Sequence, residues 1–207
     1  MHTSQPKIQL PPIRGNVYKY GEAVSYRFEL LRADDYDDLQ LFQCGNEKLN
    51  NHIKSGVIQN DMIIDKDGLY FKFTDCKRET ILGIASLATS GVLVKVGGYS
   101  HILPAIKIDI FAIDRGYQKL HYDAESENAS QKDEHYYFSD DVLGNVVQHC
   151  KKIAEQYAYA DYIVVYADKN AYRFYERNGF CDFNEYMMKE QNAEISENIP
   201  MYLDLNN

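Results

Sequence analysis

A segment near the C-terminal end of the chain places a phenol in the last turn of one predicted helix. Asp168 follows the apolar run Tyr162–Ala167, where its carboxylate can cap a helix by accepting bonds from first-turn amides. Gly179 stands where a helix stop needs a left-handed residue. Tyr175 precedes that stop, so its hydroxyl can point past the edge of a core. A phenol of pKa ~10 is protonated at neutral pH and can donate a proton or a hydrogen bond.

The elements that must position this helix alternate along the chain. Ser139 is predicted to cap a helix over 139–154, and Asp140 and Asp141 suit the positive end of its dipole. Its predicted buried stripe is Leu143, Val147, Cys150, Ala154 and Tyr157. The strand before this helix and the strand after it would be parallel neighbours. The other predicted elements are strands over 26–31, 68–74, 80–96, 105–114 and 162–167, a helical region over 34–60 broken near Cys44, and a closing hairpin of 182–189 and 199–205.

The segment 168–180 resembles the C-terminal half of the GNAT acetyltransferases, where an Asn-x-x-Ala-x-x-Phe-Tyr-x-x-x-Gly-Phe-like helix follows the fifth strand. Here the first spacing is shorter, because Asn170 directly precedes Ala171. Four further segments resemble parts of that fold in the expected order: 41–49, 80–87, 105–114 and 199–205. The resemblance implies one α/β domain over 26–205, with a mixed, twisted sheet of six to seven strands and helices on both faces. Residues 1–25 would form an N-terminal arm, disordered or strapped across the surface.

The resemblance also implies an activity, N-acetyl transfer from acetyl-CoA to a primary amine of a small molecule or protein. Tyr175 aligns with the tyrosine that serves many of these enzymes as general acid. Full proton transfer from a phenol to a thiolate would be uphill by ~2 kcal/mol, so Tyr175 would stabilise the leaving group as much as protonate it. A structural role, as a half-buried aromatic that anchors the last turn, stays open. Asp109 or Glu79 could act as general base through water.

Contacts to the cofactor follow from the same resemblance. Exposed backbone of Phe111, Ala112 and Ile113 would bind the pantetheine arm, although these are also ordinary core-strand residues. Asn170 would contact that arm, or serve as a second capping residue beside Asp168.

The pyrophosphate loop is the main departure from the family. Its glycines would let the backbone approach the phosphates at a helix start. Gln118 opens the loop correctly, but Lys119 and the residues after it replace the glycines, and 119–138 reads as an insertion. The loop could bulge and return, so that amides near 138–142 cradle phosphate with help from Lys119 or Arg115. The site could also hold acetyl-CoA weakly or differently, or be lost, and two first-turn carboxylates would repel a pyrophosphate unless both point away.

Composition limits the remaining choices. A length of 207 residues with 45% hydrophobic content fits one globular domain. A net charge of −9 argues against nucleic acid as a partner. The four cysteines and six histidines are scattered, which predicts reduced thiols in the cytoplasm and no metal site. No apolar run is long enough to span a membrane.

Two alternatives to the general acetyltransferase stay open. The Cys44-Gly45 region resembles a toxin-like subgroup that acetylates aminoacyl-tRNA, although the acidic charge speaks against docking a polyanion. A non-catalytic binding module could have kept the fold and lost the cofactor loop. A homodimer is compatible with the resemblance, since family members often pair through edge strands or the C-terminal hairpin.

Overall fold

The computed structural model describes residues 17–19, 22–56, 58, 69–120, 137–183 and 197–206. The chain divides into two compact units. Unit 1 comprises Met1–Ile84 and Ala112–Asp141, and unit 2 comprises Ala85–Phe111 and Val142–Asn207. The predicted insertion falls largely on 121–136, outside the described residues, as does most of the predicted N-terminal arm.

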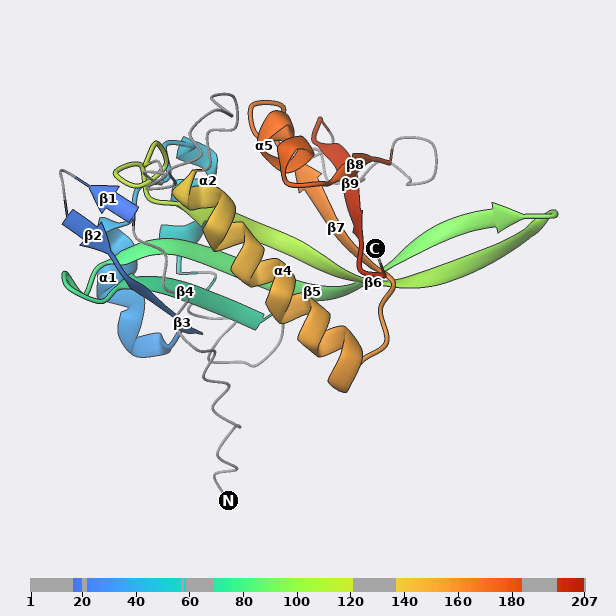
Figure 1. The fold of residues 1–207 in the computed structure, drawn as a ribbon, viewed down its shortest axis with the longest axis horizontal. Coiled ribbons are helices and arrows are strands. Elements are labelled where there is room, and N and C mark those ends of the chain that lie inside the picture. Colours follow the sequence, from blue (N-terminus) through green and yellow to red (C-terminus); the bar gives the residue numbers. More distant parts are fainter. Residues whose placement is uncertain are drawn as a thin grey trace, which may run out of the picture. The chain divides into compact units, whose positions relative to one another are not determined.

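Seven strands form a mixed sheet in the order β3-β4-β5-β6-β7-β9-β8 (Figure 1). Pairing is parallel between β6 and β7 and antiparallel between β3 and β4 and between β7 and β9. The predicted α/β fold with a mixed sheet of six to seven strands is therefore confirmed. The strands are β3 (Tyr26–Leu30), β4 (Leu69–Asp75), β5 (Ile81–Val96), β6 (Tyr99–Ile113), β7 (Tyr162–Ala167), β8 (Cys181–Asp182) and β9 (Ile199–Asp204).

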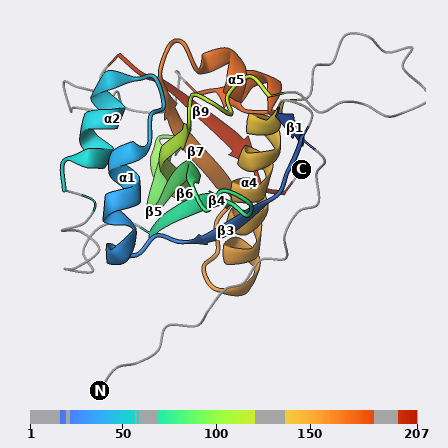
Figure 2. The same ribbon diagram turned by 90° about the vertical axis from the view of Figure 1, so that its left-hand side faces the viewer.

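Unit 1 packs short helices against its strands. After β3 come η1 (Ala33–Asp35), α1 (Tyr36–Leu41) and α2 (Glu47–Lys54), and Figure 2 shows α1 and α2 side by side. The predicted break near Cys44 is present, since Gly45 has a φ of 83° and Asn46 caps α2 through a bond from Leu49 N. The unit's fully buried side chains include Leu39, Phe42, Ile53, Phe73 and Leu82.

The segment predicted to be a disordered or surface-strapped arm contains a short hairpin in unit 1. Strand β1 (Val17–Lys19) pairs antiparallel with β2 (Glu22–Val24). Backbone N–H and C=O groups of 17–19 and 22–24 therefore bond to each other rather than to water alone.

Unit 2 contains the predicted parallel βαβ arrangement. Helix α4 (Phe138–Gln156) connects β6 to β7, and most of it belongs to this unit. It starts one residue before Ser139, so Ser139 lies in the first turn and the predicted cap is wrong. Leu143 and Cys150 are buried as predicted, but Tyr157 is exposed because the helix ends before it. Helix α5 (Tyr172–Arg177) follows β7.

Among the described helices, none combines the length and the apolar character needed to cross a membrane.

Candidate functional site

The ladder between β6 and β7 in unit 2 stops before either strand ends. Its last pair is Ile108 with Val165, yet β7 continues to Ala167 and β6 continues beyond Phe111. Backbone N–H and C=O groups beyond this pair are therefore not used in the β6–β7 ladder. The end of β7 is therefore not paired with β6. An amide-containing chain could bond to such an edge.

Helix α5 lies against this open end of β6. The ring of Phe111 stacks on Phe174 with 5.7 Å between centroids. Tyr175 follows Phe174, is buried, and packs edge-to-face on Phe174 and Phe180 at 5.1 and 5.4 Å. Burial raises the pKa of the Tyr175 hydroxyl above its ordinary value, so the phenol stays protonated well beyond neutral pH.

The turn before α5 differs from the predicted cap. Asp168 Oδ1 accepts a bond from the backbone N–H of Asn170 at 2.8 Å, which forms a local turn before the helix starts at Tyr172. The residue at the helix cap is Ala171, whose side chain makes no capping bond. Asn170 itself is exposed, so its side-chain amide faces solvent rather than the first turn. Gly179, with a φ of 85°, ends the segment as predicted.

The turn after β6, in unit 1, is held by side chains of its own unit. Gln118 Nε2 donates to Cys44 O at 2.6 Å and to Ile113 O at 2.9 Å. Asp114 accepts from Gly116 N and Gln43 N at 2.9 and 3.1 Å. The predicted cofactor residue Gln118 therefore uses its NH₂ group to join this turn to the segment before α2.

At the start of α4, some of the amides near 138–142 that could cradle a phosphate already have acceptors. Phe138 N donates to Leu120 O at 2.9 Å, and Asp140 N donates to Tyr137 O at 3.0 Å. Asp140 Oδ2 accepts from Tyr137 N at 3.0 Å, which is the reach of a third helical residue back to the cap. Asp141 Oδ2 accepts from the Tyr26 hydroxyl. Both carboxylates stabilise the helix start, and the amides of Phe138 and Asp140 already have acceptors.

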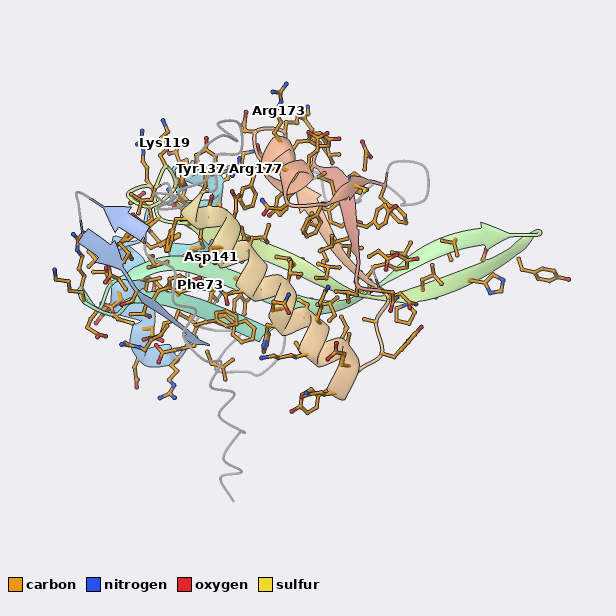
Figure 3. The ribbon with its side chains drawn as sticks, in the orientation of Figure 1. Phe73, Lys119, Tyr137, Asp141, Arg173 and Arg177 are labelled. Atoms are coloured by element: carbon orange, nitrogen blue, oxygen red, sulfur yellow. The ribbon has the colours of Figure 1, made fainter. Side chains whose placement is uncertain are left out.

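Two cations follow β6 in unit 1. Lys119 and Arg115 have exposed side chains, and Figure 3 labels Lys119. The backbone of Arg115 is fixed by a bond from its N–H to Gln43 O at 2.7 Å. Both side chains can therefore extend toward an anion, and Lys119 is the one that directly follows Gln118.

Neither candidate base is an unpaired carboxylate. Asp109 forms an ion pair with Lys107 at 2.7 Å, and Lys107 also lies 5.0 Å from the centre of the Tyr166 ring. Glu79 makes a two-point contact with Arg27, and this hydrogen bonding lowers the pKa of its carboxyl. A lowered pKa makes Glu79 a weaker proton acceptor than an ordinary glutamate. Asp109 lies on the same strand as Phe111.

Comparison with known proteins identifies the fold. No protein-family model matches the chain, and no curated protein matches it by sequence. Solved structures do match. A bacterial toxin aligns at TM-score 0.64 and 19% identity, covering 87% of this chain and 91% of the other. A tyrosine-to-phenylalanine variant of the toxin AtaT, bound to the C-terminus of the antitoxin AtaR and acetyl-CoA, aligns at 0.59 and 17%, covering 87% and 94%. AtaT complexed with acetyl-methionyl-tRNAfMet aligns at 0.60 and 16%, covering 87% and 95%.

The protein has the GNAT fold. Within unit 2, this fold brings together Phe111 and Tyr175 through the shared neighbour Phe174, with Asn170 in the turn that leads into the same helix. Within unit 1, it brings Ile113 to Gln118, while Ala112 is buried and Lys119 is exposed.

The GNAT fold also positions residues that sequence reasoning did not assign. Lys107, Asp109 and Phe111 occur at spacing two on β6, and they are more exposed than the buried Ile106, Ile108 and Ile110 between them. This alternation was visible in the sequence and would have placed Asp109 on the same face as Phe111. A groove of about 260 Å³ in unit 1 was not anticipated. It is lined by Asp38, Leu41, Phe42, Arg78, Thr80, Ile81, Asp114 and Tyr117.

Proposed function

We propose that the protein is an N-acetyltransferase that moves an acetyl group from acetyl-CoA to a primary amine of a small molecule or protein. The observation that carries this proposal is the stacking of Phe111 on Phe174 in unit 2. It joins the open end of β6, where the ladder to β7 has stopped, to the helix that holds Tyr175. An extended chain of amides bonded to that strand end would therefore lie near a buried, protonated phenol.

The reaction forms an N–C bond and breaks the C–S bond of the thioester. The amine must lose a proton, and the departing CoA sulfur gains negative charge. We assign Tyr175 to donate a hydrogen bond to that sulfur. Because burial raises the pKa of its hydroxyl, complete proton transfer to the thiolate is less favourable than for an ordinary phenol. Most of the acceleration would come from holding amine and thioester together, worth up to ~7–11 kcal/mol in ideal cases.

The residues present fit the pantetheine arm of acetyl-CoA better than its pyrophosphate. Backbone groups of Phe111, Ala112 and Ile113 would bind the pantetheine amides, and the exposed Asn170 amide would bond to the same arm. Gln118 retains its side-chain oxygen for a contact, since its NH₂ group is already used. The start of α4 does not fit a pyrophosphate, so we assign the phosphate contact to Lys119. Structures of AtaT with acetyl-CoA support the choice of cofactor, and one of them carries a tyrosine-to-phenylalanine change.

A second candidate is acetylation of aminoacyl-tRNA. AtaT, which shares the fold, was solved with acetyl-methionyl-tRNAfMet. Arg173 and Arg177 lie four residues apart on α5 with exposed side chains, which is a spacing that places two cations on one helix face (Figure 3). The net charge of −9 opposes docking of a polyanion, so this candidate requires a local basic surface. Rates with aminoacyl-tRNA and with simple amines, compared at two salt concentrations, distinguish the two substrates.

Calorimetric titration tests the proposal before any acceptor is known. Acetyl-CoA, desulfo-CoA and acetyl-pantetheine are titrated into the full chain. Binding of acetyl-CoA that weakens for acetyl-pantetheine supports a cofactor site with a phosphate contact. The absence of binding at millimolar acetyl-CoA would reject the enzyme and leave the third reading, a non-catalytic module that kept the fold.

A further inference from the structure

The groove of unit 1 is formed by three segments that are distant in sequence. Helix α1 with the residue after it, the turn between β4 and β5 with the start of β5, and the turn after β6 each supply part of its lining. Its volume of about 260 Å³ is below the roughly 300–1,000 Å³ of most small-molecule sites, so it suits a small ligand. None of the residues assigned to acetyl transfer lines this groove.

Hydrogen bonds fix the walls of the groove relative to one another. Gln43 N, just after α1, donates to Asp114 Oδ2 at 3.1 Å, which joins the end of the helix to the turn after β6. The Tyr117 hydroxyl in that turn donates to Asp75 Oδ2 at 2.8 Å, and Asp75 Oδ1 accepts from Arg78 N at 3.1 Å. Asp75 therefore joins the turn after β6 to the β4–β5 turn. A groove with its walls already held loses less entropy when a ligand binds.

Two opposite charges face this groove without neutralising each other. Asp38 of α1 and Arg78 of the β4–β5 turn both line it and are exposed. Neither side chain forms an ion pair or hydrogen bond with the other, or with any further residue that the structure describes. Asp114 adds a second carboxylate, whose two oxygens already accept backbone N–H groups. A ligand with an ammonium and a carboxylate can therefore bridge Asp38 and Arg78, whereas a ligand of one charge can satisfy only one of them.

An exposed apolar side chain lies beside the acidic one. Leu41 follows Asp38 by three residues, a spacing that places both side chains on one face of α1. Leu41 is 76% exposed, whereas Phe42 and Ile81, which also line the groove, are buried. An apolar group of a ligand placed on Leu41 would remove both surfaces from water, which favours binding.

We propose that the unit 1 groove binds a free α-amino acid with an apolar side chain. Its ammonium lies at Asp38, its carboxylate at Arg78 and its side chain against Leu41. The α-carbon carries all three groups, so one small molecule meets the three features together. Such a ligand has only about nine non-hydrogen atoms, and its ion pairs are open to solvent, so the Kd should be about 1 mM. The proposal does not depend on acetyl transfer.

NMR titration of the isotope-labelled full chain with L-leucine tests this site. The backbone amide signals of residues that line the groove should shift and saturate. Three related compounds each lack one of the recognised groups: L-leucinamide has no carboxylate, 4-methylpentanoate has no ammonium, and glycine has no apolar side chain. Each should bind about fivefold more weakly than L-leucine, because each loses one solvent-exposed interaction.

Variants of the two charged residues connect each ligand group to its partner. Asp38→Asn and Arg78→Gln should each raise the Kd for L-leucine about fivefold. Arg78→Gln should leave the Kd for L-leucinamide unchanged, and Asp38→Asn should leave that for 4-methylpentanoate unchanged, because the group that met the altered side chain is absent. Asp37→Asn and Lys77→Gln are the matched controls, since these exposed neighbours do not line the groove, and both should bind L-leucine as the wild type does.

Four results would overturn the proposal. L-leucine could cause no saturable shift up to about 50 mM, well above the expected Kd. L-leucinamide or 4-methylpentanoate could bind as tightly as L-leucine, which would assign the groove to an amine or a carboxylate alone. The control variants could weaken binding as much as the groove variants. The saturating shifts could lie at Phe111 and Tyr175 instead, which would place the amino acid at the acetyl-transfer site. The amide spectrum of each variant also reports whether it has folded.

Discussion

The hydroxyl of Tyr26 donates a hydrogen bond of 2.5 Å to Oδ2 of Asp141, which joins the first residue of β3 to the first turn of α4. The Tyr26 ring is buried and packs edge-to-face on Phe73 and Phe138, with centroids 5.9 and 5.3 Å away. Tyr26→Phe keeps this packing and removes the bond to a carboxylate. We expect a loss of about 1.5–3 kcal/mol in the free energy of unfolding, measured by urea denaturation.

Tyr159→Phe is the matched control for this bond. It also removes a Tyr–Asp hydrogen bond, from the Tyr159 hydroxyl to Asp161 Oδ1 at 2.7 Å, but on the surface. The change in unfolding free energy should stay within about 0.5 kcal/mol. Equal losses of unfolding free energy in the two variants would show that burial does not strengthen the hydrogen bond of Tyr26.

A substitution at Gln118 distinguishes a role in stability from the predicted role in cofactor binding. Gln118→Ala removes both donors to Cys44 O and Ile113 O, so we expect about 1–3 kcal/mol of destabilisation without any ligand present. Gln148→Ala, at an exposed position of α4, should be neutral. A Gln118 variant that unfolds like the wild type, yet binds acetyl-CoA more weakly, would assign the side chain to the cofactor alone.

Local patterns predicted the elements, but they could not predict partners distant in sequence. The apolar run 162–167 and the stop at Gly179 located β7 and the end of α5, since strand burial and positive φ leave signs within a few residues. Tyr26 and Asp141 are 115 positions apart, and Gln118 and Cys44 are 74 apart. Nothing local marks these pairs. The acceptor of the Phe138 N–H could not be predicted for the same reason, because Leu120 lies near the opposite end of the predicted insertion.

His149 should make stability depend on pH. Its side chain is 2% exposed in α4, and burial lowers its pKa to about 4, with Lys152 adding to the effect. The unfolded chain, with a histidine pKa near 6.5, therefore binds the proton first. The contribution to stability is fully present above pH 6.5 and is lost as pH falls toward 4, by about 3 kcal/mol for this group alone.

Paired variants isolate this dependence from the titration of carboxylates. His149→Gln should flatten the pH dependence of the unfolding free energy between pH 6.5 and about 4. His52→Gln, at an exposed position of α2, should leave the wild-type slope. Identical slopes in the three proteins would mean that His149 binds its proton equally well in the native and unfolded states.

Lys119 tests the phosphate contact. Lys119→Ala should raise the Kd for acetyl-CoA about tenfold, by losing one cation–phosphate interaction, and should leave the Kd for acetyl-pantetheine unchanged. Lys48→Ala, which removes an exposed lysine of α2, is the charge-matched control. Equal effects of the two variants would indicate only a change in overall charge, and the phosphate contact would have to be sought elsewhere.

Tyr175 is the decisive residue for the proposed chemistry. Tyr175→Phe keeps the ring contacts to Phe174 and Phe180 and removes the hydroxyl. With the best amine from an acceptor screen, kcat should fall about 100-fold, because a donor to the developing thiolate is lost in the transition state. The Kd for acetyl-CoA should change less than about twofold, since a donor used in the transition state adds little to ground-state binding. Thiol release measures the rate, and calorimetry measures binding. Tyr172→Phe, on the same helix, should retain the wild-type kcat. If Tyr175→Phe turns over normally but unfolds more easily, Tyr175 is an anchor of the last turn and the acid must be another group.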